Sequence, residues 1–132
     1  MIKGVHHIAY ITDDLERLSG YFQEVLGFQF IKKLHYESWD LDIVLMKTGD
    51  QYVEIIEPRA PGSAPYRFLE KHGEGLYHVA YVSTDIEKDM EMLKEKGIKF
   101  LEEKPQEGVA WLIATAVNEE GDIIFQIAQN KE

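Results

Sequence analysis

Apolar and polar residues alternate in the same way at two places in the chain. The stretches "VHHIAYITDD" (residues 5–14) and "LYHVAYVSTD" (residues 76–85) align without gaps. Side chains two residues apart in a strand share a face, so each stretch predicts a strand with one apolar face. Apolar residues at helical spacing follow each stretch and end near Gly27 in the first copy and Gly97 in the second. The pattern therefore predicts a strand and then a helix in each half.

The starts of both helices carry a capping signal. Asp13 stands three residues before Glu16, and Thr84 stands three residues before Glu87. This is the spacing of a capping box, in which the first side chain accepts a hydrogen bond from the start of the helix. We therefore expect Asp13 and Thr84 to be the helix N-caps.

Three strands are predicted after each helix. The first of them lies at "FQFIKKL" in one half and at "IKFLEEK" in the other. Further on, "LMKTGDQYVEIIEP" and "AVNEEGDIIFQIAQ" each contain a Gly-Asp turn before an apolar strand, which places Glu54 opposite Gln126. Each half thus reads as a βαβββ module, and two copies at a period of about 70 residues indicate an internal duplication.

These modules set the expected domain organisation. We expect one α+β domain over residues 1–132, with module one at about 3–58 and module two at about 75–130. The linker at about 59–74 is rich in Pro, Gly and Ser, and Ser63 is placed to cap a short helix within it. A chain of this length can bury a core without disulfides.

Composition narrows the class of protein. The chain has no cysteine and a formal net charge of −10. The lack of cysteine excludes thiolate metal sites and fits a reducing compartment. The acidic balance argues against a nucleic-acid partner, because phosphate binding needs clustered Lys and Arg. No run of residues is long and apolar enough for a membrane span, so we expect a cytoplasmic protein with no membrane partner.

Four polar residues stand on otherwise apolar strand faces: His7, Glu54, His78 and Gln126. Each alone has an ordinary interpretation, as a hydrogen-bonded core residue or as a side chain on the exposed side of a strand. Their equivalent places in the two modules favour a shared role, because a pseudo-twofold pairing of the modules would bring them together. Two imidazoles, a carboxylate and an amide oxygen suit a divalent metal ion, with Zn, Co, Ni, Mn and Fe(II) all left open.

The remaining histidines stand outside this set. His6 points to the opposite face from His7 and has Tyr77 as its counterpart in the second copy, so we interpret it as structural or exposed. His72 is expected at the end of the linker helix, and the role of His35 stays open.

Three longer stretches resemble the vicinal oxygen chelate superfamily, which includes glyoxalase I, bleomycin-resistance proteins and extradiol dioxygenases. They are "VHHIAYITDDLERLSGYFQEVLGF", "TGDQYVEIIEP" and "SAPYRFLEKHGEGLYHVAYVSTDIEKDMEMLKEKGIKF". They are most similar to the methylmalonyl-CoA epimerase family. The resemblance implies that two βαβββ modules form an open cupped barrel around a metal held by His7, Glu54, His78 and Gln126. It also implies a homodimer and a small-molecule substrate with two adjacent oxygens.

The same resemblance implies a reaction. It points to a metal-dependent isomerase or lyase that stabilises the enolate of a small acid or acyl thioester, as in methylmalonyl-CoA epimerase or glyoxalase I. Glu54 would serve as one acid/base, and Glu37 lies close to the family's other acidic residue. The chain departs from the epimerases at Gln126, where a glutamate is usual, and in a shorter segment before the last strand. These departures leave the substrate open.

Two other functions remain in competition. One is a binding protein of the bleomycin-resistance type, which sequesters a ligand without chemistry; the retained metal residues count against it. The other is an Fe(II) extradiol dioxygenase. Its carboxylate ligand normally comes from the last strand, where this chain has Gln126.

Overall fold

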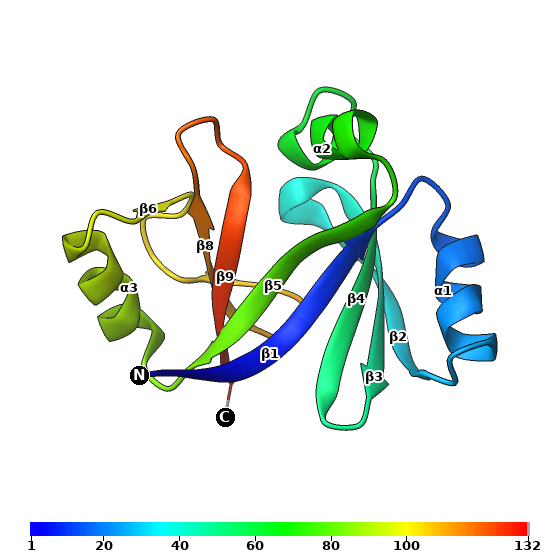
Figure 1. The fold of residues 1–132 in the computed structure, drawn as a ribbon, viewed down its shortest axis with the longest axis horizontal. Helices are drawn as coiled ribbons and strands as arrows, with labels where there is room; N and C mark the ends of the chain where they lie inside the picture. The colour runs from blue at the N-terminus through cyan, green and yellow to red at the C-terminus, as the bar shows by residue number, and fades with distance from the viewer. Residues whose placement is uncertain (132) are drawn as a thin grey trace. The chain divides into compact units, whose positions relative to one another are not determined.

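The computed structural model describes residues 1–131, which form two compact units (Figure 1). One unit consists of residues 7–77, and the other consists of residues 1–6 together with the chain from residue 78 onward. Over the described residues the chain has three α-helices and nine strands, which confirms the expected α+β class. In chain order the elements are β1 (Ile2–Ile11), α1 (Leu15–Glu24), β2 (Gln29–Tyr36), the 3-10 helix η1 (Glu37–Trp39), β3 (Leu41–Thr48), β4 (Gln51–Pro58), α2 (Ala64–His72), β5 (Gly75–Ser83), α3 (Ile86–Glu95), β6 (Lys99–Phe100), β7 (Gln106–Glu107), β8 (Trp111–Val117) and β9 (Ile123–Asn130).

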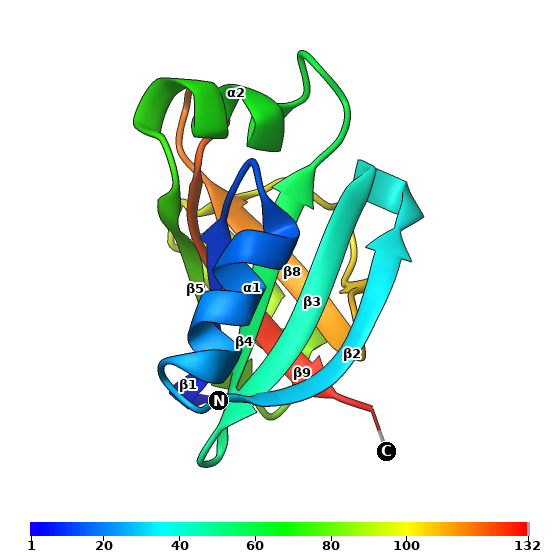
Figure 2. The ribbon, with the colours of Figure 1, turned by 90° about the vertical axis from the view of Figure 1, so that its right-hand side faces the viewer.

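The unit of residues 7–77 is a mixed sheet covered by one helix. Its strands run in the order β2-β3-β4-β1, with β1 parallel to β4 and the other pairs antiparallel. Helix α1 packs on β3 and β4 (Figure 2). Its apolar residues recur every three or four positions, so Leu15, Leu18 and Phe22 share the face that meets Met46 and Ile55. Burial of this stripe holds the helix on the sheet.

The second unit repeats the arrangement. Its strands run in the order β5-β9-β8-β6, with β5 parallel to β9, and the short β7 also pairs with β8. Helix α3 lies against β8 and β9, where Ile86 and Met90 pack on Ala114 and Ile127. The sheet of neither unit closes on itself, because β2 and β6 are edge strands.

The strand register preserves the duplication. In one unit Ala9 is the partner of Glu54 on the parallel strand, and in the other Ala80 is the partner of Gln126. The gap-free alignment of the two strand motifs, together with the alignment at the Gly-Asp turns, predicts this correspondence. The structure therefore confirms that position 54 and position 126 are equivalent.

The helix starts differ from the prediction by one residue. Asp14 and Asp85 are the N-caps, and their side chains accept hydrogen bonds from the backbone N–H of Arg17 (3.2 Å) and Lys88 (3.3 Å). Asp13 and Thr84 are therefore not the caps, because an aspartate one residue later fills that place in both copies. The linker helix α2 is capped by Ser63, as expected.

The predicted strand "IKFLEEK" is much shorter than expected. Only Lys99 and Phe100 are strand, although the N–H of Leu101 still donates to the carbonyl of Thr115 (2.8 Å). In a continued antiparallel pair the N–H of Thr115 would donate back to Leu101. It instead donates to the carboxylate of Glu102 (2.6 Å), so a side chain ends the ladder here.

None of the helices within residues 1–131 is long and apolar enough to cross a membrane.

Candidate functional site

The first pair of candidate ligands lies in the unit of residues 7–77. His7 on β1 and Glu54 on β4 are only 1% and 5% exposed. The parallel register sets Glu54 beside Ala9, and His7 shares the face of Ala9 two residues earlier. The imidazole Nε2 of His7 is 3.8 Å from a carboxylate oxygen of Glu54, which is too long for a hydrogen bond between them.

Glu54 is a buried carboxylate that accepts no hydrogen bond within residues 1–131. Burial alone raises the pKa of its carboxyl group to about 8. A carboxylate in such a place is costly unless a cation balances it. On the β3 side, the residue opposite Glu54 is the buried and apolar Leu45, which offers no hydrogen bond to the carboxylate. Glu54 therefore fits the role of an anionic metal ligand.

The second pair of candidate ligands lies in the other unit. His78 on β5 and Gln126 on β9 are 6% and 3% exposed. Gln126 is set beside Ala80, and His78 stands two residues before Ala80 on the same face. His78 and Gln126 therefore stand at the same strand positions, relative to their alanine neighbour, as His7 and Glu54.

Burial also controls the charge of His78. It lowers the pKa of the imidazole to about 4, so the ring is neutral near pH 7. The neutral imidazole is the form that binds metals, because its ring nitrogen then carries a lone pair. His78 is thus in the right state to act as a ligand.

Two residues that the sequence pattern did not predict belong to the surroundings of Gln126: Thr115 contacts it directly, and Glu102 contacts Thr115. The amide nitrogen of Gln126 donates to the hydroxyl of Thr115 on β8 (3.1 Å), and that hydroxyl donates to Glu102 (2.8 Å). A signal was present for Thr115, a lone polar residue inside the apolar strand "WLIATAV". Glu102 lies in a charged segment that gives no such signal.

The other candidates have different surroundings. Glu37 is exposed on η1, between β2 and β3. His35 is exposed, and its Nδ1–H donates a hydrogen bond to the carboxylate of Asp42 (2.8 Å), which raises the pKa of the imidazole. His6 is buried and hydrogen-bonded to Asn130 (2.7 Å), in agreement with a structural role. His72 ends α2, as expected.

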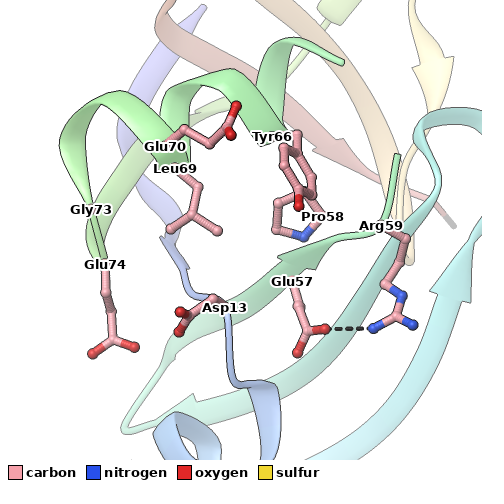
Figure 3. Close-up of a pocket in the computed structure, with 9 residues that line it drawn as sticks. All are labelled: Asp13, Glu57, Pro58, Arg59, Tyr66, Leu69, Glu70, Gly73 and Glu74. Atoms are coloured by element: carbon pink, nitrogen blue, oxygen red, sulfur yellow. Dashed lines mark hydrogen bonds and ion pairs between the residues drawn. The ribbon is translucent and has the colours of Figure 1, made fainter. Parts of the chain in front are cut away.

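A separate pocket of about 540 Å³ lies in the unit of residues 7–77, between α2 and the end of β4 (Figure 3). The carboxylate of Glu57 projects into it but is already engaged. One oxygen accepts from the N–H of Leu15 at the start of α1 (2.9 Å), and the other accepts from Arg59 (2.6 Å). Glu57 thus has a structural role, and this pocket is a weaker candidate for chemistry than the buried residues His7, Glu54, His78 and Gln126.

Buried His and Glu or Gln pairs at equivalent places of a duplicated βαβββ module define a recognisable class of protein. A model of the Glyoxalase/Bleomycin resistance protein/Dioxygenase superfamily matches residues 6–115. The chain belongs to this superfamily, which confirms the resemblance seen in the sequence.

Relatives in sequence include proteins of known and unknown activity. An uncharacterized protein of Bacillus subtilis, YwkD, is 32% identical over 102 residues, which cover 75% of this chain and 76% of that protein. The ethylmalonyl-CoA/methylmalonyl-CoA epimerase of Cereibacter sphaeroides is 26% identical over 102 residues, covering 76% of each chain. The chain is therefore related to acyl-CoA epimerases.

The fold agrees with solved structures of such enzymes. A variant of the Streptomyces coelicolor methylmalonyl-CoA epimerase, in complex with 2-nitronate-propionyl-CoA, superposes with a TM-score of 0.90. The match covers 98% of this chain and 96% of that one, at 22% identity. This likeness shows that the two chains share a fold.

Proposed function

We propose that the protein is a metal-dependent epimerase or glyoxalase-type lyase that stabilises the enolate of a small acid or acyl thioester. His7, Glu54, His78 and Gln126 would hold a divalent metal ion as one set. The observation that carries this proposal is Glu54, a buried carboxylate that accepts no hydrogen bond from residues 1–131 and lies 3.8 Å from a buried histidine.

The donor set supports the metal. His7, Glu54 and His78 each offer one buried nitrogen or oxygen ligand atom, and members of this superfamily commonly bind a divalent metal. Imidazole and carboxylate ligands suit Co, Ni, Zn, Mn and Fe(II) alike. A bound ion would supply electrostatic stabilisation of the charge that develops on the substrate oxygen. Because each unit contributes one pair of ligands, we also propose that residues 1–132 act as a single domain.

The proton transfer falls to two carboxylates. An epimerase removes the α-proton on one face of the substrate and returns a proton on the other, with no change in oxidation state. We assign Glu54 to one side of this exchange and Glu37 to the other. Glu37 is exposed, so its proton can exchange with water. The relationship to an ethylmalonyl-CoA/methylmalonyl-CoA epimerase supports a malonyl-type acyl-CoA as the substrate of this chain. Such a substrate would present two adjacent oxygens. A cytoplasmic homodimer completes the proposal.

Metal analysis of the purified protein is the decisive first test. We expect about one divalent ion per chain after incubation with Co²⁺ or Ni²⁺, and loss of that ion in His7→Ala and His78→Ala. Wild-type protein that takes up no metal under these conditions would falsify the enzymatic proposal. A non-catalytic binding protein of the bleomycin-resistance type would then be the better description.

Isotope exchange tests the substrate and the base. Methylmalonyl-CoA in heavy water should gain deuterium at its α-carbon in the presence of the metal-loaded protein. Glu54→Gln should abolish this exchange, since an amide cannot accept the proton. A metal-loaded protein without exchange would point to another acid or to a glyoxalase substrate, and full activity of Glu54→Gln would remove Glu54 as the base.

A further inference from the structure

We propose that Glu102 and Thr115 fix the orientation of the Gln126 side chain and make position 126 selective for glutamine over glutamate. In this reading Glu102 and Thr115 are positioning residues for the amide oxygen of Gln126. The direction of that oxygen toward a metal rests on the proposed function. The orientation itself rests only on hydrogen bonds within one unit of the structure.

Glu102 accepts hydrogen bonds from Thr115 with both of its carboxylate oxygens. Its Oε1 accepts from the backbone N–H of Thr115 (2.6 Å), and its Oε2 accepts from the hydroxyl of Thr115 (2.8 Å). A hydroxyl group has a single hydrogen to donate. The hydroxyl of Thr115 has given that hydrogen to Glu102, so toward any further neighbour it can act only as an acceptor.

That restriction determines which end of Gln126 faces Thr115. The amide nitrogen Nε2 lies 3.1 Å from the Thr115 hydroxyl and donates to it. The two ends of a glutamine amide are nearly alike in shape, and only the hydrogen-bond network tells them apart. Here the network leaves one answer. The oxygen Oε1 must point away from Thr115, and within residues 1–131 it accepts no hydrogen bond.

Burial makes this arrangement strict. Thr115 is 0% exposed and Gln126 is 3% exposed, so water is a poor substitute for either hydrogen bond. The equivalent position in the other unit has no such hydroxyl. The residue opposite Glu54 is Leu45, whereas the residue opposite Gln126 is Thr115. The duplicated strands therefore present two different environments, one for a carboxylate and one for an amide.

A glutamate at position 126 would conflict with Glu102. Two carboxylates would then flank one hydroxyl that has one hydrogen, so one of them would be left without a donor at that contact. Like charges in a buried place also repel. The contacts with Thr115 and Glu102 therefore favour an amide over a carboxylate at position 126.

Exchanging the two residues provides a sharp test. In Glu102→Gln the new amide would accept from the N–H of Thr115 and donate to its hydroxyl, so the hydroxyl would donate onward to position 126. That reversed chain suits a glutamate there. Gln126→Glu should therefore lower the urea midpoint strongly in the wild-type background, and by roughly half or less of that amount in the Glu102→Gln background.

Metal affinity gives the readout specific to positioning. Loss of a residue that hydrogen-bonds to a metal ligand and orients it typically weakens metal affinity by about 10–100-fold. We expect a drop of that order in Co²⁺ affinity for Thr115→Val, and near-complete retention for Thr115→Ser, which keeps the hydroxyl. Glu103→Gln is the matched control, because it removes the same charge from an exposed neighbour that does not contact Thr115.

The outcomes separate this inference from the proposed function. Equal drops in the urea midpoint for Gln126→Glu in both backgrounds would overturn the inference, whether or not metal binds. Wild-type protein without metal affinity would refute the proposed function, and the urea experiment would still decide the orientation of Gln126. Co²⁺ affinity that survives unchanged in Thr115→Val would show that the hydroxyl does not position a ligand.

Discussion

At the scale of single residues, the site combines groups whose burial opposes their charge. Glu54 and His78 both have pKa values displaced by burial toward the neutral form, to about 8 and about 4. A neutral histidine costs the fold little, but an ionised Glu54 is expensive without a cation. Glu54 therefore identifies the candidate site best, because an ionised carboxylate there destabilises the fold unless a cation is bound.

Glu54 predicts an unusual pH dependence for the metal-free protein. The folded chain keeps a proton on Glu54 up to about pH 8, whereas the unfolded chain releases it near pH 4.5. Glu54 alone should thus lower the free energy of unfolding as the pH rises through this window, by on the order of a few kcal/mol. His78 has the opposite effect below about pH 6.5, because burial lowers the pKa of its imidazole to about 4, so the net fall is expected between about pH 6.5 and pH 8. Glu54→Gln should remove most of this fall and stabilise the metal-free protein at pH 8, as measured by urea unfolding. Identical pH profiles for the two proteins would contradict the assignment.

His35 predicts a second titration of the same sign. Its hydrogen bond to Asp42 raises the pKa of the imidazole above 6.5. Any stability that this contact contributes is present at low pH and is lost as the pH rises through the raised pKa. NMR titration of the ring should show the raised pKa in the wild-type protein and a lower value in Asp42→Asn. An unchanged titration in that variant would mean that another group raises the pKa.

At the scale of elements, side chains from other segments decide where helices and strands begin and end. Asp14 caps α1 locally, but the N–H of Leu15 is bonded by Glu57 from the end of β4. Similarly, Glu102 stops the pairing of β6 with β8. Capping spacing in the sequence located both long helices to within one residue, because caps act over three residues. It could not locate the end of β6, because the group that ends it bonds across to another strand.

Glu57 should therefore matter more than its neighbours in the same pocket. Glu57→Ala removes a charge-assisted hydrogen bond at the start of α1 and the contact with Arg59, and we expect a loss of about 1–2 kcal/mol in the free energy of unfolding. Glu70→Ala, at the exposed rim of the pocket, should change it by less than about 0.5 kcal/mol. Chemical denaturation measures both, and equal losses would show that the start of α1 does not depend on Glu57.

At the scale of the whole molecule, the proposed metal set predicts that metal binding stabilises the entire chain. A ligand that binds only the folded state at about 100 times its Kd adds about 2.7 kcal/mol to the free energy of unfolding. We expect Co²⁺ to raise the Tm of the wild-type protein by several degrees. His7→Ala and His78→Ala leave the acidic surface intact and should abolish the shift, so an equal shift in these variants would indicate non-specific binding to a chain with net charge −10.

The sequence by itself determined the duplication, the α+β class, the helices and the equivalence of Glu54 and Gln126. These follow from periodicity and from short-range spacing, which are properties of neighbouring residues. Only the tertiary structure decided that the residue opposite Glu54 is Leu45 and that the residue opposite Gln126 is Thr115 held by Glu102. Such contacts join strands and loops that are distant in sequence, and a hydrogen-bond direction is set by partners that no local pattern contains. Gln126 is a plain amide in the sequence, and the fold gives that amide its direction.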